Sequence, residues 1–132
     1  MARILIADDN PMVARLVAAK LKGQGYEVDV VTDGTQAMEL ALRSPPDLCI
    51  LDVMMPGMDG YQVMEAVRAM PDFAALPIIA VTAKAMAGDR ERAIAYGASD
   101  YITKPVDVEQ LLSLMGIWLY PAIGGGPSSE AA

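Results

Sequence analysis

The sequence predicts an α/β fold in which helices cover a five-stranded parallel sheet. Short apolar runs rich in β-branched residues alternate five times with longer stretches of helical periodicity, which is the pattern of repeated strand–helix–strand units. Residues 48–51 and 78–81 are apolar without a break, as expected of strands buried on both faces. The length of 132 residues corresponds to one domain. We expect that domain over residues 1–120, followed by a flexible tail over 121–132, which is rich in Gly, Pro and Ser.

The first two strands are each followed by an amphipathic helix. Residues 3–7 form the first strand, and Asn10 as N-cap with Pro11 at the first helical position starts the next helix. Its predicted apolar face consists of Val13, Leu16, Val17 and Leu21, and Gly23 and Gly25 end it. Residues 28–31 form the second strand. The second helix carries Ala37, Met38, Leu40, Ala41 and Leu42, and the Ser-Pro-Pro sequence at 44–46 stops it.

The third strand is expected in the middle of the sheet, because residues 48–51 are apolar throughout and the run ends only at Asp52. The loop 53–60 contains Pro56, Gly57 and Gly60, which are typical of turns. The third helix follows this loop, with an apolar face of Val63, Met64, Ala66, Val67 and Met70.

The last two strands are short. Residues 78–81 form a buried strand that ends at Thr82, and a helix through 90–94 follows and is closed by Gly97. Residues 101–103 form a brief fifth strand. Asp107 is the predicted N-cap of a last helix from 108 to about 119, whose apolar stripe includes Leu111, Leu112 and Met115.

Composition excludes several classes of function. Seventeen acidic and ten basic residues give a net charge of −7, which lacks the basic footprint of a nucleic-acid-binding protein. Histidine is absent, so the commonest general base and metal ligand is missing. Cys49 is the single cysteine, so an intramolecular disulfide is excluded, and we expect its side chain to be buried as a small apolar group. A reducing, cytoplasmic setting fits this composition. No apolar stretch reaches the roughly 20 residues of a membrane span, and Asp8 and Asp9 interrupt the amino terminus too early for a signal peptide.

Polar residues follow four of the predicted strands at their carboxyl ends: Asp8, Asp9, Asp52, Thr82 and Lys104. In open parallel sheets, ligands bind just beyond these ends. Three carboxylates gathered there repel one another unless a cation is present, and oxygen ligands alone favour Mg²⁺. Lys104 and Thr82 would then contact the oxygens of a transferring phosphoryl group. The pattern therefore suits phosphoryl transfer to a carboxylate.

Taken one at a time, most of these residues have simpler interpretations. Asp8 and Asp9 equally suit a solvated helix start favoured by the helix dipole. Thr82 suits an ordinary strand end, and Lys104 suits a surface charge. Asp52 is harder to explain structurally, because an ionised carboxylate after a buried strand is costly unless it is paired or binds a metal.

Four motifs carry a family resemblance: Ile6-Ala7-Asp8-Asp9-Asn10, residues 51–60, Val81-Thr82-Ala83 and Lys104-Pro105. In this order and spacing, the chain resembles the receiver domains of two-component response regulators from residue 3 to about residue 119. The resemblance implies a flavodoxin-like, doubly wound parallel sheet with strand order 2-1-3-4-5 and five helices. It also implies a cis peptide bond between Lys104 and Pro105.

The same resemblance implies a role for each acidic residue. Asp52 is expected to be the phosphoacceptor, which attacks phosphorus and becomes an aspartyl phosphate. Asp9 is expected to bind Mg²⁺ directly, together with Asp52 and the backbone carbonyl of Met54, while Asp8 binds directly or through water. Lys104 would pair with the phosphoryl group.

The resemblance further implies a switch. Thr82 would move to hydrogen-bond the phosphoryl oxygens, and inward rotation of Tyr101 would accompany this movement. Without the family match, Tyr101 reads as a half-buried strand aromatic. Met54 and Lys84 lie two positions beyond Asp52 and Thr82, and are expected to tune the lifetime of the phosphoryl group.

The function implied is a signalling switch that catalyses only its own phosphorylation and dephosphorylation. A sensor histidine kinase or a histidine phosphotransfer protein would donate the phosphoryl group. The fourth helix, fifth strand and fifth helix would present a changed surface to a downstream protein, and homodimerisation on phosphorylation stays open. No nucleic acid or membrane is expected as a partner.

Several alternatives remain at this stage. A Mg²⁺-dependent phosphohydrolase or phosphotransferase would need a second acid–base carboxylate and a capping insertion, which the short connections do not provide. A pseudo-receiver would bind partners without being phosphorylated. A flavin-binding module is disfavoured, because the loop Asp8-Asp9-Asn10-Pro11 is negative where an anion would have to bind.

Overall fold

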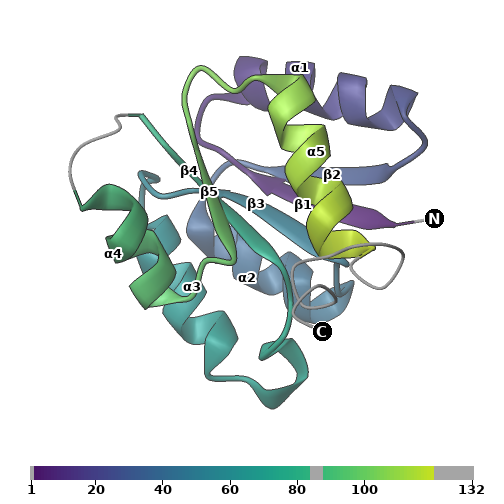
Figure 1. Ribbon diagram of the computed structural model, residues 1–132. Coiled ribbons are helices and arrows are strands. Elements are labelled where there is room, and N and C mark those ends of the chain that lie inside the picture. Colours follow the sequence, from purple (N-terminus) through teal and green to yellow (C-terminus); the bar gives the residue numbers. More distant parts are fainter. Residues whose placement is uncertain (1, 84–87, 121–132) are drawn as a thin grey trace, which may run out of the picture.

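The structure is a computed structural model that describes residues 2–83 and 88–120. Its centre is a five-stranded parallel sheet in the order β2-β1-β3-β4-β5 (Figure 1). The strands are β1 (Arg3–Ala7), β2 (Glu27–Val31), β3 (Leu48–Asp52), β4 (Ile78–Thr82) and β5 (Asp100–Thr103). The expected strand order is confirmed, and β3 lies in the middle with all five residues buried.

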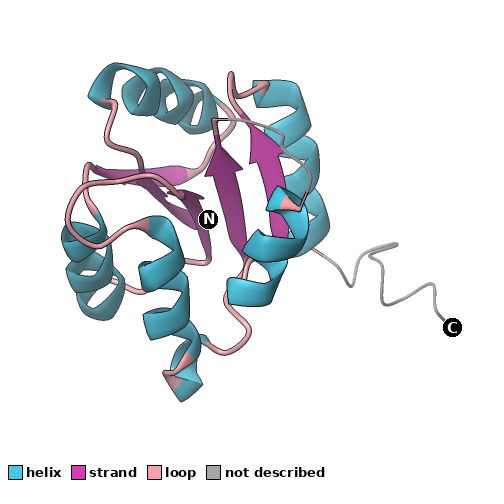
Figure 2. Ribbon diagram, turned by 90° about the vertical axis from the view of Figure 1, so that its left-hand side faces the viewer, coloured by secondary structure: helices cyan, strands magenta, loops and turns pink. Residues whose placement is uncertain are grey.

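Helices cover both faces of this sheet (Figure 2). They are α1 (Pro11–Gly23), α2 (Gly34–Arg43), α3 (Gly60–Arg68), α4 (Asp89–Tyr96) and α5 (Val108–Leu119), with a 3₁₀ turn, η1 (Pro71–Phe73), after α3. In Figure 1, α1 and α5 lie on one side of the sheet, and α2, α3 and α4 lie on the other. The core consists accordingly of two apolar layers.

Alternation along the strands supplies both layers. Successive side chains of a strand point to opposite faces of the sheet. On β1, Ile4 and Ile6 pack with the residues of α1 and α5, whereas Leu5 and Ala7 pack with those of α2 and α3. Because both faces are covered, the central strands are apolar without interruption, which explains why the sequence shows them so clearly.

The predicted helix ends are largely confirmed. The Asn10 side chain accepts hydrogen bonds at the start of α1, and Asp107 does so at the start of α5. Gly97 follows α4 with a φ of 120°, a left-handed conformation that favours glycine. A capping box that the sequence reading did not identify starts α3, where the side chains of Asp59 and Gln62 each accept the other residue's backbone N–H.

Two apolar assignments were wrong. Leu16 is 62% exposed, because the buried stripe of α1 runs through Ala14, Val17, Ala18 and Leu21 instead. Met70 lies outside α3, which ends at Arg68. Its backbone is extended, because the following Pro71 disfavours a helical conformation for the residue before it. The second strand also starts one residue earlier than predicted, at Glu27.

Cys49 is buried, as expected, and burial raises the pKa of its thiol to about 12, while the charge of Arg68 opposes this shift. The predicted tail over 121–132 lies outside the described residues, and so does Lys84, which is expected to tune the lifetime of the phosphoryl group. Within the described part of the chain, each helix is too short or too polar to cross a bilayer.

Candidate functional site

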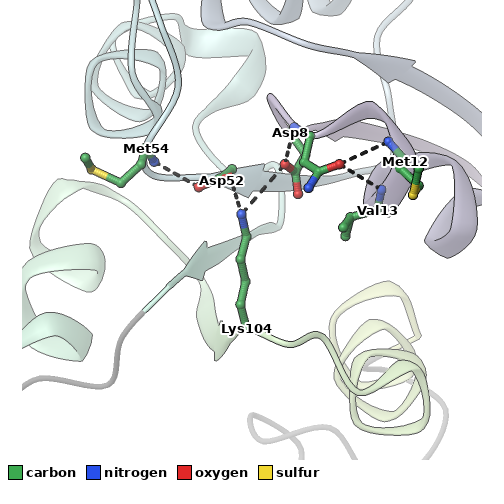
Figure 3. A network of polar contacts seen from close by, with 7 residues as sticks. Asp8, Met12, Val13, Asp52, Met54 and Lys104 are labelled. Atoms are coloured by element: carbon green, nitrogen blue, oxygen red, sulfur yellow. Dashed lines mark hydrogen bonds and ion pairs between the residues drawn. The ribbon is translucent and has the colours of Figure 1, made fainter.

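The polar strand ends predicted from the sequence meet at the carboxyl edge of the sheet. Asp8 follows β1 directly, Asp52 is the last residue of β3, Thr82 is the last of β4, and Lys104 follows β5 directly. Figure 3 shows Lys104 reaching from its loop toward Asp52 and Asp8. Because β3 pairs with both β1 and β4, Asp52 lies at the centre of the group.

Asp52 and Lys104 form the shortest ion pair of the described residues. The Lys104 Nζ donates to Asp52 Oδ2 at 2.7 Å, and the backbone N–H of Met54 donates to Asp52 Oδ1 at 2.9 Å. The Asp52 side chain is only 2% exposed, and burying a carboxylate is costly unless it has such hydrogen-bonding and charged partners. Partial burial lowers the pKa of Lys104, but the hydrogen bond and charge of Asp52 outweigh this and raise it above 10.5.

Asp8 is the second buried carboxylate of the site, and Asp9 beside it is exposed. The backbone N–H of Asn10 donates to Asp8 Oδ1 at 2.9 Å, and this oxygen lies 3.7 Å from Lys104 Nζ. Burial raises the pKa of Asp8; the hydrogen bond from Asn10 lowers it, and the negative charge of Asp52 raises it again. The net shift is upward, because burial and the charge of Asp52 together disfavour the ionised form of Asp8 more than Asn10 and Lys104 favour it.

The donor set fits a hard divalent cation. Carboxylate oxygens of Asp8, Asp9 and Asp52 lie within 4.8 Å of one another. Lys104 provides one positive charge for these three negative groups. All three ligand atoms are oxygens, and the exposed Asp9 leaves access to water. This matches the preference of Mg²⁺, which keeps several of its waters when bound. A cation at this place would oppose the upward shift that burial and the charge of Asp52 give to the pKa of Asp8.

The two predicted switch residues lie on neighbouring strands. Thr82 is buried, and its backbone carbonyl accepts the N–H of Lys104 at 2.8 Å. Tyr101 is half-buried on β5 and packs on the side of the sheet that carries α2, α3 and α4. The predicted cis peptide bond between Lys104 and Pro105 is present.

Two features of the site were missed by the sequence reading. Met54 contributes its backbone N–H to Asp52, while its side chain is 67% exposed. Gly60 lets the start of α3 approach the end of β3, since a Cβ there would lie 2.4 Å from the Asp52 carbonyl oxygen and 2.6 Å from Val53 Cα. The sequence contains a signal for the second feature only, namely a glycine directly after the helix cap Asp59.

Two large side chains outside the carboxylate cluster, Arg92 and Trp118, make defined contacts. Arg92 is exposed on α4, and its guanidinium lies 4.5 Å from the centre of the Tyr61 ring. Trp118 is half-buried against the α1–α5 layer, and its Nε1 donates to Asp100 Oδ2 at 3.0 Å. Trp118 therefore closes the core at the end of α5.

Comparison with known proteins agrees with this architecture. The sequence model of the response regulator receiver domain matches residues 4–115. Over 106 residues, the chain is 44% identical to the response regulator PleD of Caulobacter vibrioides, which covers 80% of this chain and 23% of PleD. Over 112 residues, it is 39% identical to the signal transduction histidine-protein kinase BarA of Escherichia coli, which covers 85% of this chain and 12% of BarA. The chain thus spans a small part of the length of either relative.

Solved structures show the same fold. The receiver domain of the sensor histidine kinase PA1611 from Pseudomonas aeruginosa, solved with a magnesium ion coordinated in its active-site cleft, is 36% identical with a TM-score of 0.82, covering 89% of this chain and 97% of that one. The chemotaxis response regulator CheY4 of Vibrio cholerae is 32% identical with a TM-score of 0.85, and the match covers 90% of this chain and 99% of that one. From its sequence, its strand order and the residues at its sheet edge, this chain belongs to the response regulator receiver domain family of two-component signalling.

Proposed function

We propose that this chain is a phosphorylation switch in which Asp52 accepts a phosphoryl group from a sensor histidine kinase or a histidine phosphotransfer protein. The observation that carries this proposal is the buried Asp52 carboxylate at the end of the central strand, held by Lys104 at 2.7 Å among three clustered carboxylates. A carboxylate held in place beside a positive charge is positioned for nucleophilic attack.

In the transfer step, a carboxylate oxygen of Asp52 forms a bond to phosphorus, while the bond from phosphorus to the donor's leaving atom breaks. The leaving group takes the electron pair, and Asp52 becomes an aspartyl phosphate. Lys104 lies beside the attacking group and would pair with a phosphoryl oxygen, because its ammonium already bonds to Asp52 Oδ2. The Thr82 hydroxyl would supply a neutral hydrogen bond to the same group.

Asp8, Asp9, Asp52 and the backbone carbonyl of Met54 would hold Mg²⁺. When bound, the ion supplies positive charge that offsets the charge of the phosphoryl oxygens and of Asp52. The magnesium ion in the PA1611 receiver domain, together with the carboxylate cluster of this chain, supports this assignment. Apart from this self-phosphorylation and its reversal, we expect no catalytic turnover.

The output would be a change in partner binding. Movement of Thr82 toward the phosphoryl group and inward rotation of Tyr101 would alter the surface formed by α4, β5 and α5. A downstream protein would read this surface, and homodimerisation of the phosphorylated form is one mode that the test below can reveal. The half-buried position of Tyr101 on β5, the strand that contacts α4, supports this route.

The intact mass of the protein after incubation with acetyl phosphate, with Mg²⁺ or with EDTA, tests the proposal. We expect one added phosphoryl group in Mg²⁺ only, and none in Asp52→Asn. Asp59→Asn is the matched control, because Asp59 caps α3 outside the carboxylate cluster. Size-exclusion chromatography of the same samples would report any dimer. An unmodified wild type that binds Mg²⁺ and is folded would contradict the proposal and favour a pseudo-receiver.

A further inference from the structure

The helix α4 packs against β5 and against α3, with little buried side-chain surface of its own. Ala93 is its one buried residue, and left-handed glycines, Gly88 at φ 89° and Gly97 at φ 120°, flank the helix. At the carboxyl end of α4, the Arg68 Nε of α3 donates to the Gly97 carbonyl oxygen at 2.9 Å. Few buried contacts between two glycine joints are typical of an element that moves at low energetic cost.

A second attachment to α3 lies along the side of α4. The rings of Tyr61 on α3 and Tyr96 on α4 are 4.8 Å apart between centroids and inclined by 44°. The guanidinium of Arg92 on α4 lies 4.5 Å from the centre of the same Tyr61 ring. Tyr61 thus contacts α4 twice, through an aromatic pair and a cation–π contact. We name Tyr61, Arg92 and Tyr96 the α4 clamp.

The two tyrosines of the α4 clamp lie in the same apolar layer as the predicted switch residue Tyr101. Partial burial raises the pKa of Tyr101, and the charge of Asp89 on α4 raises it further, followed by contributions of Tyr61 and Glu91. Tyr101 and Tyr61 pack against the same apolar cluster, and β5, which carries Tyr101, contacts α4. Rotation of the Tyr101 side chain out of this layer would change the packing around Tyr61 and Tyr96.

We propose that the α4 clamp stabilises the unphosphorylated position of α4 and thereby opposes phosphorylation-induced switching. The inference rests on the proposed phosphoacceptor role of Asp52. A cation–π contact acts only within about 6 Å of the ring centre, so a shift of α4 along α3 weakens it. If the clamp stabilises one state of α4, linkage requires that it lower the affinity of the site for any ligand that prefers the other state.

The expected effect is small and measurable. An exposed cation–π contact changes an equilibrium by about two- to fivefold. Loss of the Arg92 contact should therefore increase the affinity for a phosphoryl mimic by about two- to fivefold, and should accelerate amide hydrogen exchange in α4 of the unphosphorylated protein by a similar factor. Exchange in β3 and α1 should not change.

The experiment uses the full chain and two matched pairs of variants. Arg92→Ala is compared with Arg90→Ala, which also removes one positive charge from an exposed position of α4. Tyr61→Leu is compared with Tyr61→Phe, which keeps the ring. Amide hydrogen exchange is measured without ligand, and the half-saturating concentration of beryllium fluoride is then measured by NMR in saturating Mg²⁺.

Faster exchange in α4 and tighter beryllium fluoride binding in Arg92→Ala and Tyr61→Leu, with Arg90→Ala and Tyr61→Phe close to wild type, would support the clamp. Equal behaviour of Arg92→Ala and Arg90→Ala in both measurements would overturn it. Faster exchange with unchanged affinity would overturn the link to switching. Failure of the wild type itself to bind beryllium fluoride would refute the proposed function of Asp52, and hydrogen exchange would still decide whether the clamp restrains α4.

Discussion

Lys104→Met should destabilise the domain in the absence of metal, and Mg²⁺ should restore much of the loss. Methionine keeps most of the length of the apolar stem and removes the ammonium group. The lost group donates to Asp52 at 2.7 Å and lies 3.7 Å from Asp8, so two buried carboxylates would be left without their positive neighbour.

The magnitude follows from the burial of the pair. Removing one partner of a fully buried ion pair costs about 3–5 kcal/mol. Asp52 is almost fully buried, but the Lys104 side chain is 28% exposed and water can screen part of the freed charge. We therefore expect the free energy of unfolding to fall by about 2 kcal/mol, which corresponds to a fall in Tm of roughly 6–10 °C for a domain of this size.

Urea denaturation followed by circular dichroism measures this effect, first in EDTA and then over a range of Mg²⁺ concentrations. Mg²⁺ should stabilise Lys104→Met more than it stabilises the wild type, because the variant has one positive charge fewer at the carboxylate cluster. Lys22→Met, an exposed change of the same charge at the end of α1, is the control. A Lys104→Met variant as stable in EDTA as this control would refute the electrostatic reasoning.

Three further predictions concern single residues. Gly60→Ala should destabilise the domain by about 1–3 kcal/mol in denaturation and slow its phosphorylation, because the new methyl group would collide with the backbone at the end of β3; Gly23→Ala, which meets nothing within 4 Å, is the control. Cys49 should react with iodoacetamide at about pH 8 only after unfolding. Its raised pKa also means that the folded state holds the thiol proton more tightly, so this contribution to stability is present below pH 9 and is lost as the pH rises toward about 12. Met54→Asn should change the rate of aspartyl phosphate hydrolysis, measured by the loss of the mass adduct with time, because it places a hydrogen-bonding side chain at an exposed position next to Asp52; an unchanged rate would refute this role.

Much of the fold could be predicted from the sequence because its strongest signals are local. The unbroken apolar runs of β3 and β4 follow from burial on both faces, and Asn10 and Asp107 are efficient helix caps whose side chains bond to nearby backbone groups. Leu16 was misplaced because size and hydropathy favour it over Ala14 and Ala18, whereas close approach of α1 to the sheet favours the small residues.

The site was predictable to the level of its side chains and no further. The parallel topology requires that Asp8, Asp52, Thr82 and Lys104 meet at one edge, so their types alone indicate the chemistry. The backbone N–H of Met54 has no sequence signature, because every residue except proline carries this donor. The contact of Arg92 with Tyr61 joins residues from two helices whose relative position is a property of tertiary packing.

The register of β4 and β5 would give the proposed phosphorylation of Asp52 a short path to α4. Thr82 pairs with Thr103, and Ala80 pairs with Tyr101. Side chains two residues apart on a strand share a face, so Thr82 and Tyr101 lie diagonally on the same side of two adjacent strands. Ala80 and Tyr101 both pack in the layer that contains α4, which identifies this side. A movement of the Thr82 side chain toward Asp52 would therefore change the space available to Tyr101, which packs in the same layer as Tyr61 and Tyr96 of the α4 clamp.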